Sequence, residues 1–223
     1  MKVIILAAGK GSRLGMPHPK CLTKLKTGET ILERQINALS KYGDLKKITI
    51  VVGFKKKLIM NAFPDCNFVY NSVYDKTNTA KSLLCALNEG YNSDVIWING
   101  DVVFDSKILI PLMQSKESCM LVNTNSVEEE EIKYNLNDDG TIRQVSKNIK
   151  DGIGEAVGIN KISKKYINEF IQALEKCSDQ DYFEYAIELL IKQNIPVYPI
   201  DILKNLCMEI DFKEDLDLIN KKL

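Results

Sequence analysis

The first residues that could do chemistry lie in a glycine loop near the N-terminus. This loop contains Gly9 and Gly11 and carries three cations, Lys10, Arg13 and Lys20. Small residues let a backbone approach a ligand, and its N–H groups can point at phosphate oxygens. Arginine grips phosphate oxygens with two parallel hydrogen bonds, whereas lysine acts as a mobile point charge. The loop therefore predicts an anion site, with phosphate as the candidate anion.

Two familiar phosphate-binding loops do not fit this segment. A dinucleotide fingerprint needs a glycine where Leu14 stands, and the next glycine, Gly15, comes one residue late. The Walker pattern also fails, because neither Gly9 nor Gly11 is followed by Gly-Lys at the required spacing. What remains is a glycine loop with fixed cations behind an N-terminal strand.

The charge distribution supports an anion site early in the chain. The 223 residues hold 30 basic and 30 acidic side chains. Residues 1–60 carry 13 basic and 3 acidic residues, whereas the remaining 163 carry 17 basic and 27 acidic ones. Such a polarised chain indicates an anion site near the N-terminus and leaves room for a cation site later.

Cysteine and histidine usage excludes several classes of site. The closest two of the six cysteines are 19 residues apart, and His18 is the single histidine. A zinc site or a disulfide framework is therefore not expected. A Ser/His or Cys/His catalytic pair would need His18, which lies in a proline-flanked segment and is predicted to be a solvated loop residue.

The elements that must position the loop alternate between strands and helices. In the first half, strands are expected at 2–7, 47–52, 67–71 and 94–99, and helices at 30–42, 56–62 and 79–90. The second half predicts a hairpin (132–136 and 141–145), strands at 153–159, 196–200 and 206–210, and helices at 164–176, 182–192 and 213–220. Thr30 and Glu33 form a predicted capping box.

Repeated strand–helix units predict a mostly parallel sheet covered by helices on both faces. In such sheets ligands bind outside the carboxyl ends of the strands. The glycine loop follows the first strand, and Asp101 follows the strand at 94–99. We therefore expect the loop and Asp101 to share one cleft.

At this length a single domain is expected, without a transmembrane segment or signal peptide and in the cytoplasm. Trp97 is expected in the core. The acidic run at 128–131 and the lysines at 55–57 are expected to be solvated. The basic N-terminal part lacks the aromatic-basic repeats of a nucleic-acid binder, so no nucleic-acid partner is expected.

Several motifs together resemble those of the nucleotidyltransferases that activate sugar phosphates and similar small phosphates. They are Leu6-Ala7-Ala8-Gly9-x-Gly11-x-Arg13-Leu14, Pro19-Lys20, Asn78-Thr79-Ala80, Gly100-Asp101, Gly154-Glu155-Ala156-Val157-Gly158, and Glu209-Ile210-Asp211 with Asp215. The short length and the Glu-x-Asp ending look most like the small cytidylyltransferases of the CTP:phosphocholine and CTP:phosphoglutamine type, the latter belonging to capsule synthesis.

This resemblance implies a Rossmann-like, nucleotide-diphospho-sugar transferase-like α/β fold. It implies one domain over 1–223, with a nucleotide-binding portion at about 1–125. An acceptor-binding portion with a small β-hairpin and the late metal ligand follows at about 126–223. The implied reaction is attack of an acceptor phosphate oxygen on the α-phosphorus of CTP, with Mg²⁺ as cofactor and pyrophosphate as leaving group. It needs no side-chain nucleophile, because the acceptor phosphate is already ionised.

The resemblance also assigns roles to residues. Arg13 and Lys20 would hold the triphosphate and neutralise charge in the transition state. Asp101 and Asp211 would bind Mg²⁺, with Glu209 or Asp105 as a further ligand; Asp105 alternatively caps a helix near 106. The nucleotide-binding set is Leu6, Ala7, Ala8, Gly9, Lys10 and Gly11, with Asn78, Thr79 and Ser82 near the base.

The acceptor pocket is assigned to Arg143, Lys147, Glu155, Tyr74 and Tyr182. Arg143, Val145 and Lys147 are expected on one strand face, and Arg143 is alternatively an exposed hairpin residue. A choline acceptor would favour an aromatic cage, and Glu155 or Glu184 would suit an ammonium.

Other functions stay open from the sequence. They are a uridylyl- or thymidylyltransferase acting on a sugar 1-phosphate and a non-catalytic nucleotide-binding regulator. The expected partners are CTP and a small phosphorylated acceptor, and a homo-oligomer is possible.

Overall fold

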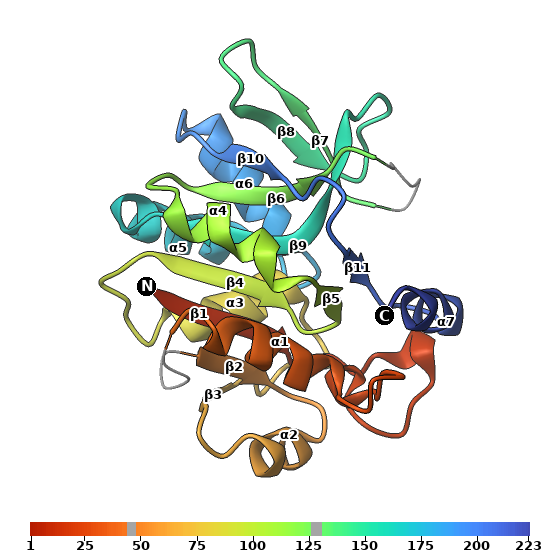
Figure 1. Ribbon diagram of the computed structural model, residues 1–223. Coiled ribbons are helices and arrows are strands. Elements are labelled where there is room, and N and C mark those ends of the chain that lie inside the picture. The colour runs from red at the N-terminus through yellow and green to blue at the C-terminus, as the bar shows by residue number, and fades with distance from the viewer. Residues whose placement is uncertain (44–47, 126–130) are drawn as a thin grey trace.

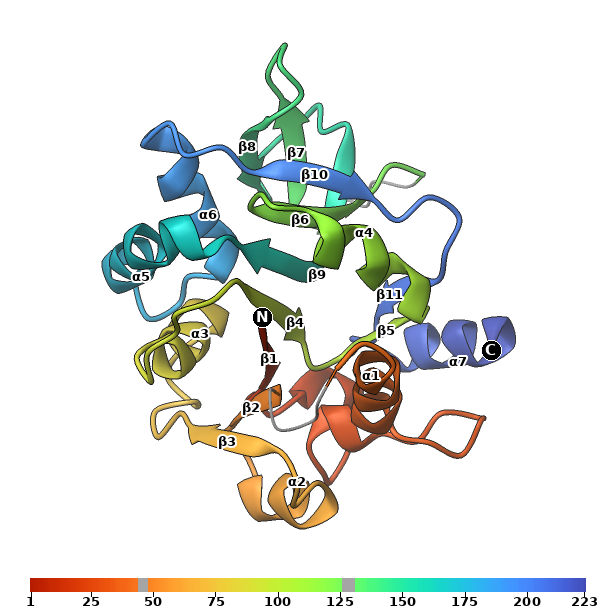
Figure 2. The same ribbon diagram turned by 60° about the vertical axis from the view of Figure 1, so that its left-hand side comes forward.

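The computed structural model describes residues 1–43, 48–125 and 131–223 (Figure 1). A central sheet has the strand order β10-β6-β9-β4-β1-β2-β3, and β7 and β8 extend it beside β9. Helices cover both faces of this sheet (Figure 2). The fold is therefore the helix-covered α/β sheet that the sequence predicts.

The first half supplies the parallel part of the sheet. Its strands are β1 (Lys2–Ala7), β2 (Ile48–Val52), β3 (Asn67–Tyr70) and β4 (Val95–Asn99), paired parallel with β1 between β2 and β4. β1, β2 and β4 are buried on both faces and read as continuous apolar runs, which is why they stand out in the sequence. Its helices are α1 (Ile31–Ser40), α2 (Lys56–Ala62) and α3 (Thr79–Leu87). The predicted capping box of Thr30 and Glu33 is confirmed at the start of α1.

The second half adds antiparallel strands. β9 (Gly154–Ile162) pairs antiparallel with β4, and β6 (Cys119–Asn123) pairs antiparallel with β9. β10 (Tyr198–Asp201) pairs parallel with β6, and the hairpin of β7 (Lys133–Leu136) and β8 (Ile142–Ser146) joins β9 through β7. The predicted hairpin is confirmed, and the sheet is mixed beyond β4.

Two apolar cores lie on the two faces of the sheet. One contains residues of α3, α5 (Ile167–Lys176) and α6 (Phe183–Lys192); here the buried ring of Trp97 stacks on Phe170 with the centroids 5.0 Å apart. The other contains residues of α1 and α4 (Leu109–Gln114). The core position of Trp97 is therefore confirmed, and the six cysteines are free thiols, as expected.

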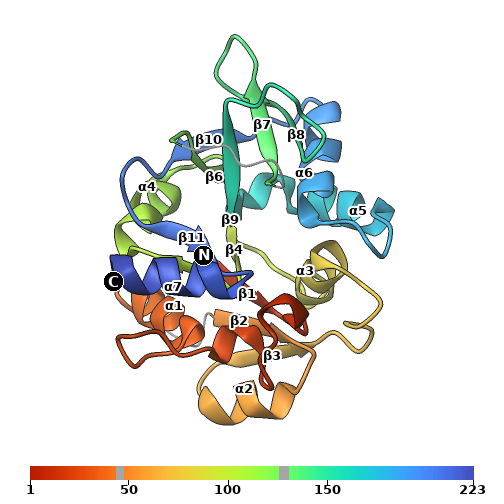
Figure 3. The same cartoon turned by 90° about the vertical axis from the view of Figure 1, so that its right-hand side faces the viewer.

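The sequence prediction lacks β5 (Val102–Phe104) and β6, and it offers a helix near 106 only as an alternative, where the structure has a turn at 106–108 that leads into α4. β5 is three residues long, α4 is short and carries Pro111, and neither has enough residues to show a period. β5 pairs antiparallel with β11 (Cys207–Glu209), and α7 (Lys213–Lys222) follows. α7 packs beside β11 and α1, with Ile219 in one cluster with Ile31 and Ile210 (Figure 3). This ribbon returns the end of the chain to the carboxyl end of β4.

The predicted shared face of Arg143, Val145 and Lys147 is wrong. Asn135 pairs with Gln144 and Leu136 pairs with Ile142, so Arg143 is an extra residue in β8. Such a bulge breaks the side-chain alternation of a strand. Arg143 is exposed, whereas Val145 is buried.

Within the described ranges, no helix is both long and apolar enough to span a membrane.

Candidate active site

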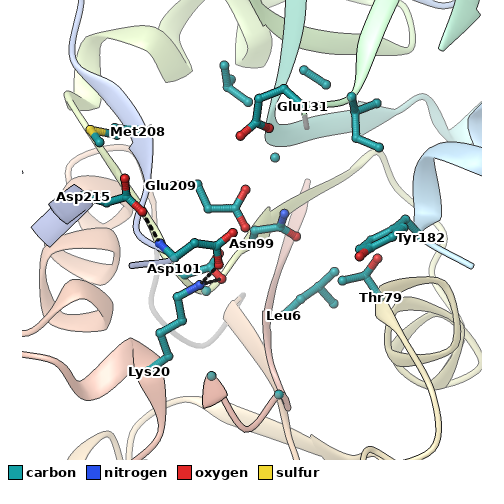
Figure 4. Close-up of a pocket in the computed structure, with 18 of the residues that line it drawn as sticks. Leu6, Lys20, Thr79, Asn99, Asp101, Glu131, Tyr182, Met208, Glu209 and Asp215 are labelled. Carbon is teal, nitrogen blue, oxygen red and sulfur yellow. Dashed lines mark hydrogen bonds and ion pairs between the residues drawn. The ribbon is translucent and has the colours of Figure 1, made fainter. Parts of the chain in front are cut away.

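A cavity of about 920 Å³ opens at the carboxyl ends of β1 and β4. The glycine loop, the start of α3, β9, β11 and the start of α7 line it (Figure 4). Figure 4 shows Lys20 together with Asp101 in one part of the cavity and Tyr182 with Thr79 in another. The structure therefore joins the glycine loop and Asp101 in one cleft, as the strand order predicts.

The glycine loop is held in a shape that only glycine adopts easily. Gly11 has φ 61°, and a Cβ atom there would lie 2.6 Å from the Cβ of Lys20. Positive φ and this close approach both require glycine. The turn Ser12–Leu14 follows directly, so Arg13 and Lys20 reach the same cavity.

Most of the predicted nucleotide-binding backbone lines the cavity. Leu6, Ala7, Gly9 and Gly11 are lining residues. Ala8 is buried instead, and its carbonyl oxygen accepts a hydrogen bond from the backbone N–H of Phe54 (3.0 Å). Lys10 is exposed, and neither it nor His18 is among the lining residues.

Three carboxylates gather where β4 and β11 end. Asp101, Glu209 and Asp211 each offer an oxygen, and these oxygens lie within 4.8 Å of one another. The backbone holds them together, because the N–H of Ile210 donates to the carbonyl of Asp101 (3.1 Å) and the N–H of Gly100 donates to Leu6 (2.9 Å). This cluster contains the three predicted metal ligands.

Two cations of the glycine loop face this cluster. The Nζ atom of Lys20 donates to Asp101 Oδ2 (2.7 Å) and to Asp211 Oδ1 (2.5 Å). Arg13 pairs with Asp211 Oδ2 (2.7 Å), and its guanidinium lies 5.4 Å from the ring centroid of Phe212. We call these five charged residues, Asp101, Glu209, Asp211, Arg13 and Lys20, the metal end of the cavity.

The metal end carries a surplus of negative charge, because three carboxylates face two cations. Burial opposes the charge of Lys20, but Asp101 and Asp211 outweigh it and raise its pKa above the ordinary value. The charge of Asp101, then burial and the charge of Asp211, raise the pKa of Glu209 well above its ordinary value. Asp101 Oδ1 is buried and has no hydrogen-bond partner among the described residues. A hard divalent cation with oxygen ligands fits this donor set.

Two further aspartates, Asp215 and Asp105, accept hydrogen bonds from backbone N–H groups near the metal end. Asp215 Oδ2 accepts from the backbone N–H groups of Asp211 (2.9 Å) and Phe212 (2.7 Å), so it holds the segment that carries Asp211. Asp105 is outside the cluster, and its side chain does not cap the turn at 106–108. Asp105 nevertheless stands at the N-cap position of that turn, and its Oδ2 accepts from Leu206 N (3.3 Å) instead.

Asn78 and Thr79 line the cavity at the start of α3. Asn78 Oδ1 accepts from Thr79 N (2.8 Å), and its Nδ2 donates to the carbonyl of Gln180 (3.3 Å). Thr79 Oγ1 accepts from Phe183 N (3.2 Å), which ties α3 to α6. Ser82 is buried and is not a lining residue; its Oγ accepts from Asn71 Nδ2 (3.1 Å).

Three predicted acceptor residues line the cavity away from Lys20. Lys147 Nζ lies 5.0 Å from the ring centroid of Tyr182, and Glu155 Oε1 accepts from Asn123 Nδ2 (3.0 Å). Tyr74 and Arg143 are not lining residues. Tyr74 packs beside Gly53, because a Cβ atom on that glycine would lie 2.6 Å from it.

The structure brings Glu184, one of the two candidates for meeting an ammonium, into the cavity, and it adds lining residues that the sequence analysis did not assign to the site. Glu184 stands in the first turn of α6, and Glu131 precedes β7; Asn99 and Phe212 also line the cavity. An acidic residue on the core-facing side of an apolar helix is a usable signal for Glu184. Glu131 belongs to a run predicted to be solvated, whose other members, 128–130, lie outside the described residues. We call Lys147, Glu155, Tyr182, Glu184 and Glu131 the acceptor end.

Comparison with known proteins adds to this geometry. A family model described as a MobA-like NTP transferase domain matches residues 3–147. A CTP:phosphoglutamine cytidylyltransferase from Campylobacter jejuni is 29% identical, over an alignment that covers 98% of each chain.

Solved structures share the fold over nearly the whole chain. The inositol-1-phosphate CTP transferase from T. maritima has a TM-score of 0.82 at 18% identity, covering 99% of this chain and 93% of that one. The CTP:phosphocholine cytidylyltransferase from Streptococcus pneumoniae has a TM-score of 0.80 at 21% identity, covering 99% and 98%. At such low identity these likenesses show the fold alone.

Proposed function

Because this chain belongs to the MobA-like NTP transferase family, matched over residues 3–147, and is thus a nucleotidyltransferase, we propose that it is a Mg²⁺-dependent cytidylyltransferase. It transfers CMP from CTP to a small phosphorylated acceptor of the phosphoglutamine or phosphocholine kind. The products are a CDP-linked compound and pyrophosphate. We place this reaction in the cytoplasm and in the modification of a surface polysaccharide or capsule.

The observation that carries the proposal is the metal end. Three carboxylates lie within 4.8 Å of one another and face Lys20 and Arg13 from the glycine loop. Two anions, the acceptor phosphate and CTP, must meet in the reaction, so positioning and charge neutralisation supply most of the rate. A bound Mg²⁺ neutralises charge on phosphate oxygens and orients them.

In this proposal the side chains of the metal end bind the metal ion and the triphosphate. Asp101, Asp211 and Glu209 hold the metal ion, and Lys20 and Arg13 bind triphosphate oxygens and the charge that grows on the leaving pyrophosphate. In the present geometry Lys20 neutralises Asp101 and Asp211 itself. With Mg²⁺ held by these aspartates, the ammonium of Lys20 would be available to the triphosphate oxygens.

Asn78 and Thr79 are the candidates for reading the base. One proton of Asn78 Nδ2 and one lone pair of Oδ1 are used within the protein. An amide carries two of each, so one donor and one acceptor remain for a cytosine edge. The choice of CTP is supported by the cytidylyltransferase relative from Campylobacter jejuni, which matches along the whole chain.

Pyrophosphate release tests the proposal. The protein is assayed with CTP, UTP, dTTP and ATP against a panel of phosphorylated acceptors that includes phosphoglutamine, phosphocholine and sugar 1-phosphates. We expect turnover with CTP and Mg²⁺ and little with the other nucleotides. Turnover confined to UTP or dTTP with a sugar 1-phosphate contradicts the cytidylyl assignment, and no turnover with any pair favours a nucleotide-binding regulator.

A further inference from the structure

The acceptor end holds a buried acid that the proposed transfer does not use. Glu184 is 6% exposed, yet it lines the cavity. Its Oε2 atom is buried and has no hydrogen-bond partner among the described residues. A buried polar atom without a partner costs free energy, and an ionised carboxylate costs more. The unpaired oxygen of Glu184 therefore indicates that a group of the bound ligand is its hydrogen-bond partner.

The charges around Glu184 do not balance it. Lys147 is the cation that acts on it, and Glu131 adds a like charge. Glu155 lines the same cavity from β9. Burial raises the pKa of Glu184 to about 7, since a backbone hydrogen bond and then the charge of Lys147 offset the cost of burial only in part. Lys147 therefore compensates the charge of Glu184 only in part.

We infer that Glu184 binds a protonated amino group of the acceptor, one that carries N–H donors, while Lys147 binds its phosphate. The inference rests on the proposed function, because it assigns the two ends of one acceptor molecule. An ammonium donates a charge-assisted hydrogen bond to a carboxylate oxygen, which neutral sugar hydroxyls do not match in strength. Binding of the amine therefore satisfies Oε2 and supplies the missing positive charge.

The aromatic content of the cavity favours an N–H-bearing amine over a quaternary one. Quaternary ammonium groups are bound by cages of several aromatic faces. Two aromatic residues are among the described lining residues, Tyr182 and Phe212. Phe212 lies at the metal end under Arg13, and the Tyr182 ring already faces Lys147. One ring does not make a cage, whereas Glu184 offers a hydrogen-bond acceptor.

Three acceptors that share an ethyl phosphate skeleton test the inference. Phosphoethanolamine carries an –NH3⁺ group, phosphocholine a trimethylammonium, and ethyl phosphate no nitrogen. With CTP and Mg²⁺ we expect kcat/KM for phosphoethanolamine to exceed that for each of the other two by about tenfold or more, the effect of one charged hydrogen bond.

Variants assign that preference to one side chain. Glu184→Gln is expected to remove most of the preference, mainly by raising the KM for phosphoethanolamine, while the KM for CTP stays within twofold. Glu184→Asp should keep part of it. The matched control is Glu188→Gln, one turn further along α6, where the acid pairs with Lys192 (2.7 Å). Glu188→Gln should behave like the wild type.

The outcomes separate the two proposals. Equal rates for the three acceptors in the wild type, or an unchanged preference in Glu184→Gln, overturn the role of Glu184 while leaving cytidylyl transfer intact. A preference for phosphocholine overturns the N–H requirement. If no acceptor of the wider panel releases pyrophosphate from CTP, the proposed function fails and the inference fails with it. Thermal unfolding of Glu184→Gln confirms folding, because a neutral isostere removes a buried charge.

Discussion

The two ends of the cavity differ in how far their charges are paired within the protein. At the metal end Lys20 and Arg13 pair with Asp101 and Asp211 before any ligand binds, with contacts of 2.5 to 2.7 Å, and the surplus negative charge suits a metal ion. At the acceptor end Glu184 keeps a buried oxygen without a partner in the described part of the chain. In the proposed reaction the metal end would act on any acceptor phosphate, whereas the acceptor end would select one class of acceptor.

This difference suggests separate roles in the proposed reaction: the metal end for catalysis and the acceptor end for the choice of acceptor. Preorganised charges lower the barrier for any acceptor phosphate that reaches the α-phosphorus. A buried charge without a counter-charge instead favours binding of a ligand that neutralises it. Binding of ligands that leave it unpaired is disfavoured. Substitutions at the metal end should abolish turnover with every acceptor. Substitutions at the acceptor end should change which acceptor has the highest kcat/KM.

The largest effect is expected for Asp101→Asn, which removes a charged metal ligand while keeping the shape of the side chain. Loss of a preorganised charge at the reacting phosphates predicts a fall in kcat of about a thousandfold for every acceptor. Pyrophosphate release at saturating CTP measures it, and calorimetric titration with CTP checks that the nucleotide still binds. A fall of less than tenfold would remove Asp101 from the metal site.

Lys20→Ala should have the next largest effect. It lowers kcat by about a hundredfold, because a cation at the triphosphate is lost. It also leaves Asp101 and Asp211 without their shared lysine, so the midpoint of thermal unfolding should fall. Added Mg²⁺ should restore more stability to this variant than to the wild type, since it replaces the missing charge. Equal shifts with Mg²⁺ in the two proteins would contradict the placement of the metal ion.

The acceptor end predicts a pH dependence of smaller size. The pKa of Glu184 is about 7, above its ordinary value of 4.5, because burial disfavours the charged form. Between these values the folded protein holds more protons than the unfolded chain, so this group makes stability fall as pH rises through the window. Ionised Glu184 is the form that binds an ammonium, so the KM for phosphoethanolamine should fall several-fold from pH 6 to pH 8.

The control for this profile is ethyl phosphate, whose phosphate titrates near pH 6 as well but which has no amine. The profiles of the two acceptors should diverge in the wild type and coincide in Glu184→Gln. Lys147, Glu131 and Glu155 are the charged groups of the same end, and they are present in both proteins. Parallel profiles in the wild type would show that Glu184 is not the titrating group that meets the acceptor.

How much of this was predictable from the sequence differs between the two ends. The metal end depends on short motifs at strand ends, so Arg13, Lys20, Asp101 and Asp211 are visible as residue types at fixed places. The parallel strand order then requires the glycine loop and Asp101 to meet, whereas Asp211 was assigned from the family resemblance. Glu209 was also predicted, although its proximity to Asp101 depends on the β5–β11 ribbon, of which the sequence prediction contained only the second strand.

The acceptor end depends on packing between distant segments, so the sequence names Glu155 and Glu184 as candidates for an ammonium without showing which of them is buried. Glu184 is a helix residue whose cavity position follows from how α6 packs against α3 and β8. Arg143 shows the opposite error. Strict alternation places it beside Lys147, but the bulge opposite Asn135 and Leu136 moves it to the surface. One extra residue in a strand changes which side chains share a face, and a single sequence carries little information about it.

The smallest predicted effect comes from comparing Arg143→Ala with Lys147→Ala. Both remove one positive charge from the same hairpin region, but only Lys147 lines the cavity. Lys147→Ala should raise the acceptor KM about tenfold, as loss of a charged hydrogen bond does, whereas Arg143→Ala should change kcat and KM less than twofold, as is usual for an exposed side chain. Kinetics at varied acceptor and saturating CTP measure both. If Arg143→Ala matches Lys147→Ala, the acceptor reaches beyond the cavity to the bulge. The acceptor end would then need a second cation, as an acceptor with a carboxylate requires.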